Sequence, residues 1–335
     1  MDFRTALAAH RRRDFEAAEA GYLALPSSAA AQHNLGLLYA SQGRYEAAEQ
    51  RLRAALALSP GFANAEHSLS MQLLAQGRYE EGWPLFEGRR RRADIFIPSP
   101  ELAFPEWRGE DLSGKRLLVI GEQGFGDQIQ FARFVRDAPA ASVVYFCAPA
   151  LAGLFRRAGL NALEAYRETP FPQADYWVLV GSLPLRLGVT LDSIPPPLHL
   201  GPPHVGGEGI GVVAQGRPTH FNDSERSLRG RDAELLLSAG RDLSPEATGA
   251  NDFAETAVVV AGLDRVVTVD TAVAHLAASM GVPTHILLPA SNPDWRWLRG
   301  REDSPWYPSV RLHRQAQPGD WRSVILGALG TNVQP

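Results

Sequence analysis

The sequence predicts a helical N-terminal part followed by two α/β lobes in series. Three observations support this prediction. The tetrapeptide Gly-Arg-Tyr-Glu at 43–46 recurs at 77–80, which is 34 residues later. From about residue 114, short apolar runs rich in β-branched residues alternate with helical segments, a pattern typical of a parallel sheet. A stretch rich in proline and glycine at 195–209 divides this alternating part into two.

Composition places the chain among ordinary globular proteins. Its 335 residues suit about two domains or three small ones, and 45% of them are hydrophobic. The net charge of −4 disfavours nucleic acid as the main partner. The single cysteine, Cys147, excludes a disulfide framework and a multi-cysteine zinc site. No apolar run is long enough to span a membrane, and the first residues lack the apolar core of a secretory signal, so we expect a cytoplasmic protein.

Residues 1–95 follow a 34-residue period, which is the period of tetratricopeptide repeats, each a pair of helices. The interlocking positions of such a pair are present as Leu35, Gly36, Tyr39, Ala48 and Leu52. A third copy follows at 69–86, and a degenerate first copy lies at 14–25. One helix pair cannot bury its own apolar face, so we expect the copies to stack and to offer a groove for a protein partner. A structural spacer or a dimer contact is the alternative. The arginine run at 89–92 is expected to be a solvated helix end.

The remaining chain is predicted to comprise a linker at 96–113, a first Rossmann-type lobe at 114–200 and a second at 206–335. Strands are expected at 115–120, 143–146, 176–180, 210–213, 265–269 and 284–288, and helices at 128–136, 232–238, 271–280 and 321–329. In sheets of this kind, ligands bind beyond the carboxyl ends of the strands. Two lobes that face each other would therefore form a cleft.

The strand that ends at residue 269 runs directly into a helix. Asp270 is predicted to be the N-cap of this helix. The backbone amides of Thr271, Ala272 and Val273 then lack intrahelical acceptors and lie at the positive end of the helix, an arrangement that binds phosphate. His275 shares a helix face with Thr271. From these residues alone, an ordinary capped helix with His275 packed against a strand is an equally good interpretation.

Resemblance to a known family favours the phosphate site. The segment Asp-Thr-Ala-Val-Ala-His-Leu-Ala at 270–277, followed by Gly-Val-Pro at 281–283, resembles the sugar-nucleotide motif of heptosyltransferase-type glycosyltransferases, which are two-lobed enzymes of the GT-B architecture. The region from 114 to 325 resembles the glycosyltransferase domain found behind tetratricopeptide repeats in bacterial proteins. The resemblance implies that Asp270, Thr271, Ala272 and His275 hold the diphosphate of a nucleotide sugar.

The loop at 121–127 carries glycines in the order G-x-x-G-x-G, which disfavours a dinucleotide-binding fingerprint. It resembles instead the Gly-x-Gly-Asp of the same family, which implies an acceptor-side loop containing Gln123, Gly124, Gly126 and Gln128. Asp127 is predicted to be the base that takes the proton of the attacking hydroxyl. The alternative is a capping aspartate, since a helix N-terminus stabilises the charged carboxylate and makes it a weaker base.

A third candidate segment follows the strand at 210–213. It resembles the family pattern Asn-Asp-x-x-Arg-Ser and implies further diphosphate contacts. These are Gln215, Arg217, Asn222, Arg226 and Ser227. The leaving nucleoside diphosphate gains negative charge, and arginine stabilises phosphate by bidentate, permanently charged contacts. Arg226 is the first choice for this role and Arg217 the second, and a solvated mobile loop is the alternative.

The sequence also departs from the family pattern. Val-Ala-Gln stands at 213–215, where a tryptophan is usual, and the strand expected between 228 and 253 is reduced to about 241–244. These departures put base recognition and full activity in doubt. Segments 294–297 and 303–308 resemble the C-terminal signature of the family, with Trp295 and Trp297 expected in a core. In GT-B enzymes the final helix, here 321–329, often returns to the first lobe.

Together these features predict an inverting, metal-independent glycosyltransferase without a cofactor. It would move a sugar from a nucleotide-sugar donor to Ser or Thr of a flagellin-like or other secreted protein docked by the repeats. Two alternatives remain open: a transferase that acts on lipopolysaccharide or polysaccharide precursors, and a non-catalytic repeat adaptor with a decayed transferase domain. No recognisable motif identifies the sugar, the nucleotide, the acceptor or the oligomeric state.

Overall fold

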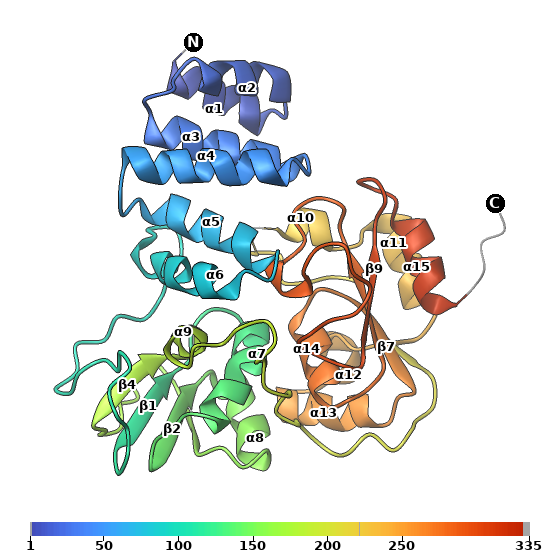
Figure 1. Ribbon diagram of the computed structural model, residues 1–335. Helices are drawn as coiled ribbons and strands as arrows, with labels where there is room; N and C mark the ends of the chain where they lie inside the picture. Colours follow the sequence, from blue (N-terminus) through green and yellow to red (C-terminus); the bar gives the residue numbers. More distant parts are fainter. Residues whose placement is uncertain (1, 221, 331–335) are drawn as a thin grey trace. The chain divides into compact units, whose positions relative to one another are not determined.

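The computed structural model describes residues 2–220 and 222–330, which fall into two compact units (Figure 1). The first unit is helical and comprises the chain up to Ile97 together with the short segment Asp294–Arg299. The second is an α/β unit that comprises Pro98–Pro293 and the residues from Gly300 onward. The predicted first lobe lies within this second unit, and so does the predicted second lobe apart from Asp294–Arg299.

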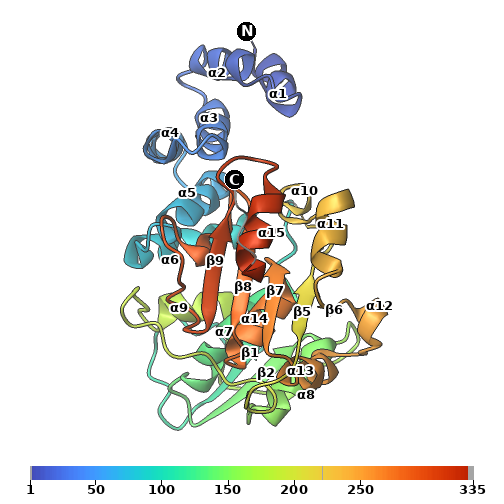
Figure 2. The ribbon, with the colours of Figure 1, turned by 90° about the vertical axis from the view of Figure 1, so that its right-hand side faces the viewer.

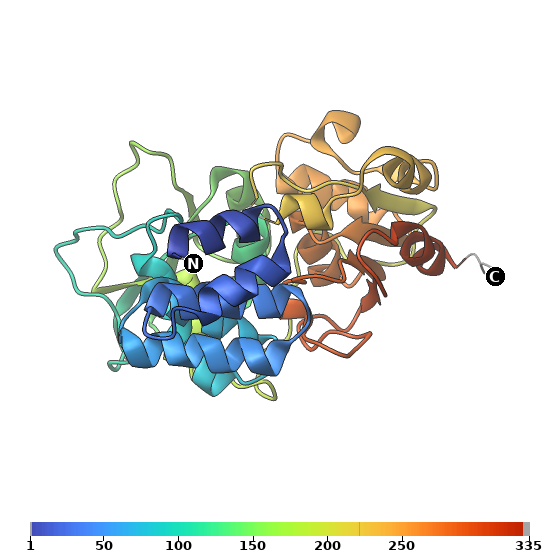
Figure 3. The ribbon, with the colours of Figure 1, turned by 90° about the horizontal axis from the view of Figure 1, so that it is seen from above.

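The helical unit consists of three helical hairpins, followed by a 3-10 helix (Figures 1 and 3). Each hairpin packs on the next through α2 with α3 and α4 with α5. The elements are α1 (Phe3–Arg11), α2 (Phe15–Leu23), α3 (Ala29–Ser41), α4 (Tyr45–Leu58), α5 (Ala63–Leu74), α6 (Tyr79–Phe86) and η1 (Glu87–Arg91).

Glycine at the hairpin turns explains part of the 34-residue period. Gly43 and Gly77 have φ values of +74° and +78°, a left-handed conformation that glycine adopts without steric cost. In the first hairpin the corresponding turn contains Arg13, with φ +61°. A non-glycine residue there is strained, which is consistent with the degeneracy of the first copy.

The arginine run at 89–92 is only in part the solvated helix end that the sequence predicted, since Arg91 is exposed but Arg89 is not. Arg89 is fully buried, and its Nη1 donates to the Phe86 carbonyl oxygen at 3.2 Å and to Glu87 Oε1 at 2.7 Å. Arg92 donates from Nε to Asp94 Oδ1 at 2.9 Å. The run therefore closes the helical unit through internal ion pairs.

The segment Asp294–Arg299 forms part of the helical unit although it lies about 200 residues later in the chain. Trp295 is 3% exposed, and its ring contacts those of Tyr79, Trp83 and Phe86 at centroid distances of 6.3, 5.4 and 6.3 Å. The prediction that the tryptophans of this segment pack in a core is confirmed for Trp297, which is fully buried, and for Trp295. The core that Trp295 joins is that of the helical unit.

We expect Trp295→Ala to lower the free energy of unfolding by about 3–5 kcal/mol, because it empties an aromatic site that cannot collapse fully. Denaturant unfolding of the full chain, followed by far-ultraviolet circular dichroism, measures the change. Phe96→Ala is the matched control, since Phe96 belongs to the same unit but is 87% exposed, and it should shift stability by less than about 0.5 kcal/mol. Equal effects of the two substitutions would contradict the assignment.

Two buried histidines should make the helical unit acid-sensitive. Burial lowers the pKa of His33 to about 4, and burial together with the neighbouring Arg92 lowers the pKa of His67 to about 3. Both groups bind protons near pH 6.5 in the unfolded chain, so their contribution to stability is present above that pH and is lost as the pH falls from 6.5 through about 4 for His33 and about 3 for His67. Unfolding midpoints measured at several pH values should fall over this range. The His33→Gln variant should show a shallower slope, and an unchanged slope would show that His33 does not contribute.

The first sheet of the α/β unit has the order β3-β2-β1-β4, and every pair among these strands is parallel. Its strands are β1 (Arg116–Ile120), β2 (Ser142–Cys147), β3 (Ala162–Glu164) and β4 (Tyr176–Leu179). The connecting helices are α7 (Phe125–Arg136), α8 (Pro149–Arg157) and α9 (Leu183–Arg186), with η2 (Val180–Ser182) before α9. Helix α7 begins three residues earlier than predicted.

The second sheet has the order β6-β5-β7-β8-β9 and is also parallel (Figure 2). Its strands are β5 (Ile210–Val213), β6 (Arg241–Asp242), β7 (Arg265–Val269), β8 (Thr284–Leu288) and β9 (Val310–Arg314). Its helices are α10 (Asp223–Arg226), α11 (Gly230–Leu237), α12 (Pro245–Thr248), α13 (Phe253–Ala261), α14 (Ala272–Ser279) and α15 (Trp321–Leu329), and η3 (Trp295–Trp297) belongs to the helical unit.

Two features of the second sheet bear on the predictions. Helix α15 does not return to the first lobe: Trp321, Val324 and Ile325 pack with α11 and with Val267 and other residues of β5, β7 and β8. Strand β6 is as short as the sequence indicated, with Arg241–Asp242 as its whole length. The mixed helix and parallel-sheet class is nevertheless as predicted.

Candidate functional site

The first turns of α7 and α14 are in contact. A Cβ atom placed on Gly126 would lie 2.8 Å from His275 Cδ2 and 3.6 Å from Ala272 Cα. Such a close approach leaves room for glycine alone. Helix α7 follows β1 and α14 follows β7, so the contact lies beyond the carboxyl ends of both strands, where α/β sheets bind ligands. We call this region the helix-start corner: loops 121–124 and 270–271 with the first turns of the two helices.

The N-cap of α14 is Thr271, and the prediction of Asp270 is wrong by one residue. Thr271 has the extended φ and ψ of −143° and 171°, and its side chain makes no capping hydrogen bond. Its Oγ1 lies 3.2 Å from Thr268 Oγ1 instead. In the described part of the chain no hydrogen bond occupies the amides of Ala272 and Val273, and both residues are half-buried. These amides are the donors that the start of α14 offers to an anion.

Arg226 places a positive charge at Asp270, the residue that precedes the N-cap of α14. Its Nη1 donates to the carbonyl oxygen of Asp270 at 2.8 Å. The guanidinium lies against Gly216, where a Cβ would be 2.6 Å from Nη2. The side chain is 13% exposed, and its Nε lies 3.9 Å from Asp223 Oδ1. The site therefore contains a guanidinium fixed at the end of β7, with part of its surface open to solvent.

A buried carboxylate organises the loop that carries Arg226. Asp223 is 5% exposed and accepts from Ser227 Oγ at 2.6 Å and from Arg229 Nη2 at 3.1 Å. Ser227 Oγ in turn accepts from the Gly216 amide at 2.9 Å. Ser227 is buried as well, so its observed role is to hold the loop and not to face a ligand. Asp223 belongs to the Asn-Asp-x-x-Arg-Ser pattern, and that pattern was the signal from which it could have been found.

The other residues predicted on this loop do not converge on the corner. Gln215 is exposed, and its Nε2 donates to the Leu228 carbonyl at 3.3 Å. Asn222 Nδ2 donates to the Asn292 carbonyl at 3.1 Å. Arg217 is exposed. Their contacts with a diphosphate remain predictions.

His275 is a buried part of the corner. It is 4% exposed, its Nδ1 lies 2.9 Å from the Tyr307 hydroxyl, and its Nε2 lies 4.0 Å from Asp270 Oδ1. The ring therefore links Tyr307, Asp270 and the glycine surface of α7. Sequence reasoning did not single out Tyr307, although the 303–308 segment that contains it was the relevant signal.

Asp127 occupies the third helical position of α7, and not its cap. Its Oδ2 accepts from the Gly124 amide at 2.9 Å, in a capping-box arrangement. The side chain is half-buried. In the loop before α7, Gln123 is exposed and has φ +59°, a strained conformation of the kind that accumulates at functional sites. The capping interpretation is thus supported by geometry, and the role of general base stays a prediction.

Gln128 has a structural role, which differs from the prediction. It is 4% exposed, and its Oε1 accepts from the Ala148 amide at 3.0 Å while lying against Gly121. Because it is covered by protein on this side, it cannot form part of an acceptor-facing surface.

Two buried charged residues were not predicted. Glu122 is 3% exposed, and its Oε1 accepts from the Gly181 amide at 3.0 Å, which fixes the loop after β1. Arg133 on α7 donates from Nη1 to the carbonyl oxygens of Trp306 at 2.9 Å and Pro195 at 3.0 Å. Arg133 therefore ties α7 to the segment that contains Tyr307.

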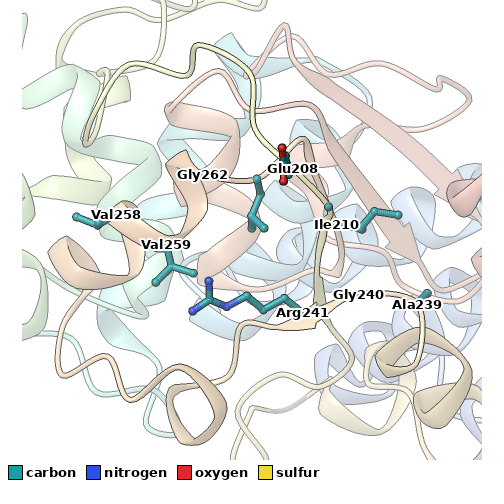
Figure 4. A pocket seen from close by; sticks show the side chains of 10 residues that line it. Glu208, Ile210, Ala239, Gly240, Arg241, Val258, Val259 and Gly262 are labelled. Atoms are coloured by element: carbon teal, nitrogen blue, oxygen red, sulfur yellow. The ribbon is translucent and has the colours of Figure 1, made fainter.

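A hollow of about 750 Å³ lies elsewhere, at the start of β5 (Figure 4). Its walls include Glu208, Arg241 and Val258, and no predicted site residue lines it. It lies at the amino end of the strand, opposite the end at which such sheets bind ligands. Among residues 2–220 and 222–330, no three His, Cys, Asp or Glu side chains are grouped as metal ligands, and none of the helices has the length and hydropathy of a membrane span.

No protein-family model matches the chain. Among curated proteins, it is similar to Protein FlbA of Caulobacter vibrioides, with 26% identity over 73% of this chain and 51% of FlbA. The chain thus spans about half the length of that relative.

Similar solved structures are glycosyltransferases. The K341M mutant of the Thermobaculum terrenum O-GlcNAc transferase is 16% identical, covers 99% of this chain and 89% of its own, and has a TM-score of 0.29. The ADP-heptose lipopolysaccharide heptosyltransferase II of Escherichia coli is 15% identical over 64% of this chain and 98% of its own, with a TM-score of 0.40. A glycosyl transferase family 9 protein of Veillonella parvula is 12% identical over 67% of this chain and 95% of its own, with a TM-score of 0.42.

Proposed function

We propose that the chain is a glycosyltransferase that takes its sugar from a nucleotide-sugar donor. The observation that carries the proposal is the helix-start corner, where α14 begins with the amides of Ala272 and Val273 and the guanidinium of Arg226 bonds to the carbonyl oxygen of Asp270 just before the helix. A bound diphosphate is stabilised by hydrogen-bond donors and by positive charge, and this corner contains both. The resemblance of segment 270–277 to a sugar-nucleotide motif supports the same ligand.

The chemistry of transfer follows from this binding mode. When the bond to the sugar breaks, negative charge grows on the departing diphosphate, and fixed donors that already point at it lower the barrier. Arg226 and the start of α14 would supply this stabilisation without a metal ion. Asp127 would accept the proton of the acceptor hydroxyl, and attack from the face opposite the leaving group would invert the sugar configuration.

The acceptor is proposed to be Ser or Thr of a protein bound by the helical unit, such as a flagellin-like or other secreted polypeptide. A stacked array of helical hairpins presents an extended surface suited to a peptide. Transfer to a lipopolysaccharide or polysaccharide precursor is the alternative within the same chemistry, and a cytoplasmic location suits a nucleotide-sugar donor in both cases.

A specific observation favours a second function, that of a non-catalytic adaptor. Strand β6 has only Arg241–Asp242, and the strand and loop at this place would help to hold a nucleoside. In addition, Asp127 is engaged by the Gly124 amide. A chain whose helical unit docks a partner, and whose α/β unit neither holds a nucleoside well nor transfers sugar, would have this geometry.

Incubation of the full chain with UDP-, ADP- and GDP-linked sugars separates these functions. A transferase should release nucleoside diphosphate, and the release should increase with a protein acceptor, whose added mass is measured by mass spectrometry. Removal of residues 1–97 is not a suitable control, because it would strip Trp295 of its aromatic partners. Neither binding nor release with any of these donors would contradict the transferase and support the adaptor, and sugar transfer to an acceptor would contradict the adaptor.

A further inference from the structure

Two phenylalanines form an edge-to-face pair at the helix-start corner. Phe125 is the first residue of α7 and Phe253 the first residue of α13. Their ring centroids are 5.3 Å apart, and the ring planes meet at 71°. The pair thus joins the starts of two helices from the two sheets of the α/β unit.

The exposure of Phe125 is unusual for an aromatic residue of this helix. Phe125 is 42% exposed, whereas Phe131 and Phe134 on the same helix are at most 1% exposed. Phe253 is half-buried and packs against the Phe125 ring. The contact restrains the exposed ring, so an apolar aromatic surface is presented to solvent with little orientational freedom left to lose on binding.

This surface is adjacent to the donors that would hold a diphosphate. Gly126 follows Phe125 directly, and a Cβ on Gly126 would be 3.6 Å from Ala272 Cα. Helix α13 also packs on α14, and both helices begin near the carboxyl edge of the second sheet. In a nucleoside diphosphate the ribose separates the base from the diphosphate. The protein must therefore bind the base and the diphosphate on two separate surfaces that are close to each other.

Resting on the proposed function, we propose that Phe125, backed by Phe253, stacks on the base of the donor nucleotide. An aromatic ring can bind any base through its face, without hydrogen-bond readout. The aromatic pair offers an exposed apolar surface for the base beside the proposed diphosphate site. Phe125 would then bind the base without selecting which base it is. It would raise the affinity for a nucleoside diphosphate above the affinity for a bare diphosphate.

Isothermal titration tests this role with four probes: UDP, ADP, GDP and inorganic pyrophosphate. The Phe125→Leu variant keeps an apolar side chain of similar size but removes the π-face. We expect it to bind the preferred nucleoside diphosphate about 10-fold more weakly, as loss of one base–aromatic stack does, and to bind pyrophosphate as the wild type does. Phe125→Trp should retain nucleotide affinity. Tyr166→Leu is the control, because Tyr166 is 58% exposed and belongs to the loop after β3.

Each result has a definite meaning. Unchanged nucleotide affinity in Phe125→Leu would overturn the stacking role while leaving the proposed function intact. An equal loss for pyrophosphate and nucleotides would also overturn it, because the ring would then act by shaping the corner. If the wild type binds none of the four probes, the proposed function fails first and the stacking role with it.

Discussion

Arg226→Ala should weaken binding of nucleoside diphosphates about 30-fold or more. The guanidinium lies at the end of β7, 2.8 Å from the Asp270 carbonyl, and supplies a positive charge at the residue that precedes the N-cap of α14. Removal of one partner from a mostly buried charged contact costs about 2–5 kcal/mol, which corresponds to this loss of affinity. Calorimetric titration with UDP, ADP and GDP gives the comparison with the wild type.

Two further variants make the Arg226 result specific. Arg231→Ala removes an exposed arginine of α11 and should leave affinity unchanged. Arg226→Lys keeps the charge but loses the planar fork, so its affinity should lie between those of the wild type and Arg226→Ala. Melting temperatures of all variants must be compared, since Arg226 also holds the Asp270 carbonyl. Full affinity in Arg226→Ala would show that the diphosphate binds elsewhere.

Asp127→Asn should reduce sugar transfer by about 10²–10⁴-fold, the usual contribution of a general base. Asparagine keeps a carbonyl oxygen that can accept from the Gly124 amide, so the start of α7 should remain folded. Nucleotide affinity and melting temperature should therefore stay close to those of the wild type. Transfer rates at saturating donor and acceptor measure the effect.

The same variant distinguishes a base from a cap. If Asp127→Asn transfers sugar at the wild-type rate, Asp127 only caps α7 and another group accepts the proton. If Asp127→Ala unfolds at a lower temperature while Asp127→Asn does not, the capping role is measured separately from the catalytic one.

Local sequence patterns were sufficient for much of the fold. The strands predicted at 210–213, 265–269 and 284–288 have the same bounds as β5, β7 and β8, because continuous apolar runs between turn residues mark buried parallel strands. The repeated tetrapeptide likewise indicated helical hairpins, since glycine is needed at each turn. At the corner, Arg226, Asp270, Thr271, Ala272 and His275 were all expected, and the structure brings them together.

Features that depend on distant parts of the chain could not be predicted in this way. The contact of Trp295 with Trp83 joins residues 212 positions apart, and no local pattern encodes it. Arg89 is buried at the end of the helical unit. A run of arginines considered by its sequence alone is predicted to be exposed to solvent. Gln128 was expected on the acceptor side at the start of a helix, but its side chain accepts from the Ala148 amide, which follows β2. Burial of polar groups follows from tertiary partners, which composition and spacing do not reveal.

Hydrogen–deuterium exchange of the backbone amides at 270–275 tests the central claim most directly. The full chain would be compared with and without a saturating nucleoside diphosphate chosen from UDP, ADP and GDP. Because the amides of Ala272 and Val273 are proposed to donate to the diphosphate, bound nucleotide should slow exchange in this segment and around Arg226. Nucleotide binding that leaves exchange at 270–275 unchanged, or a chain that binds none of the three, would contradict the account.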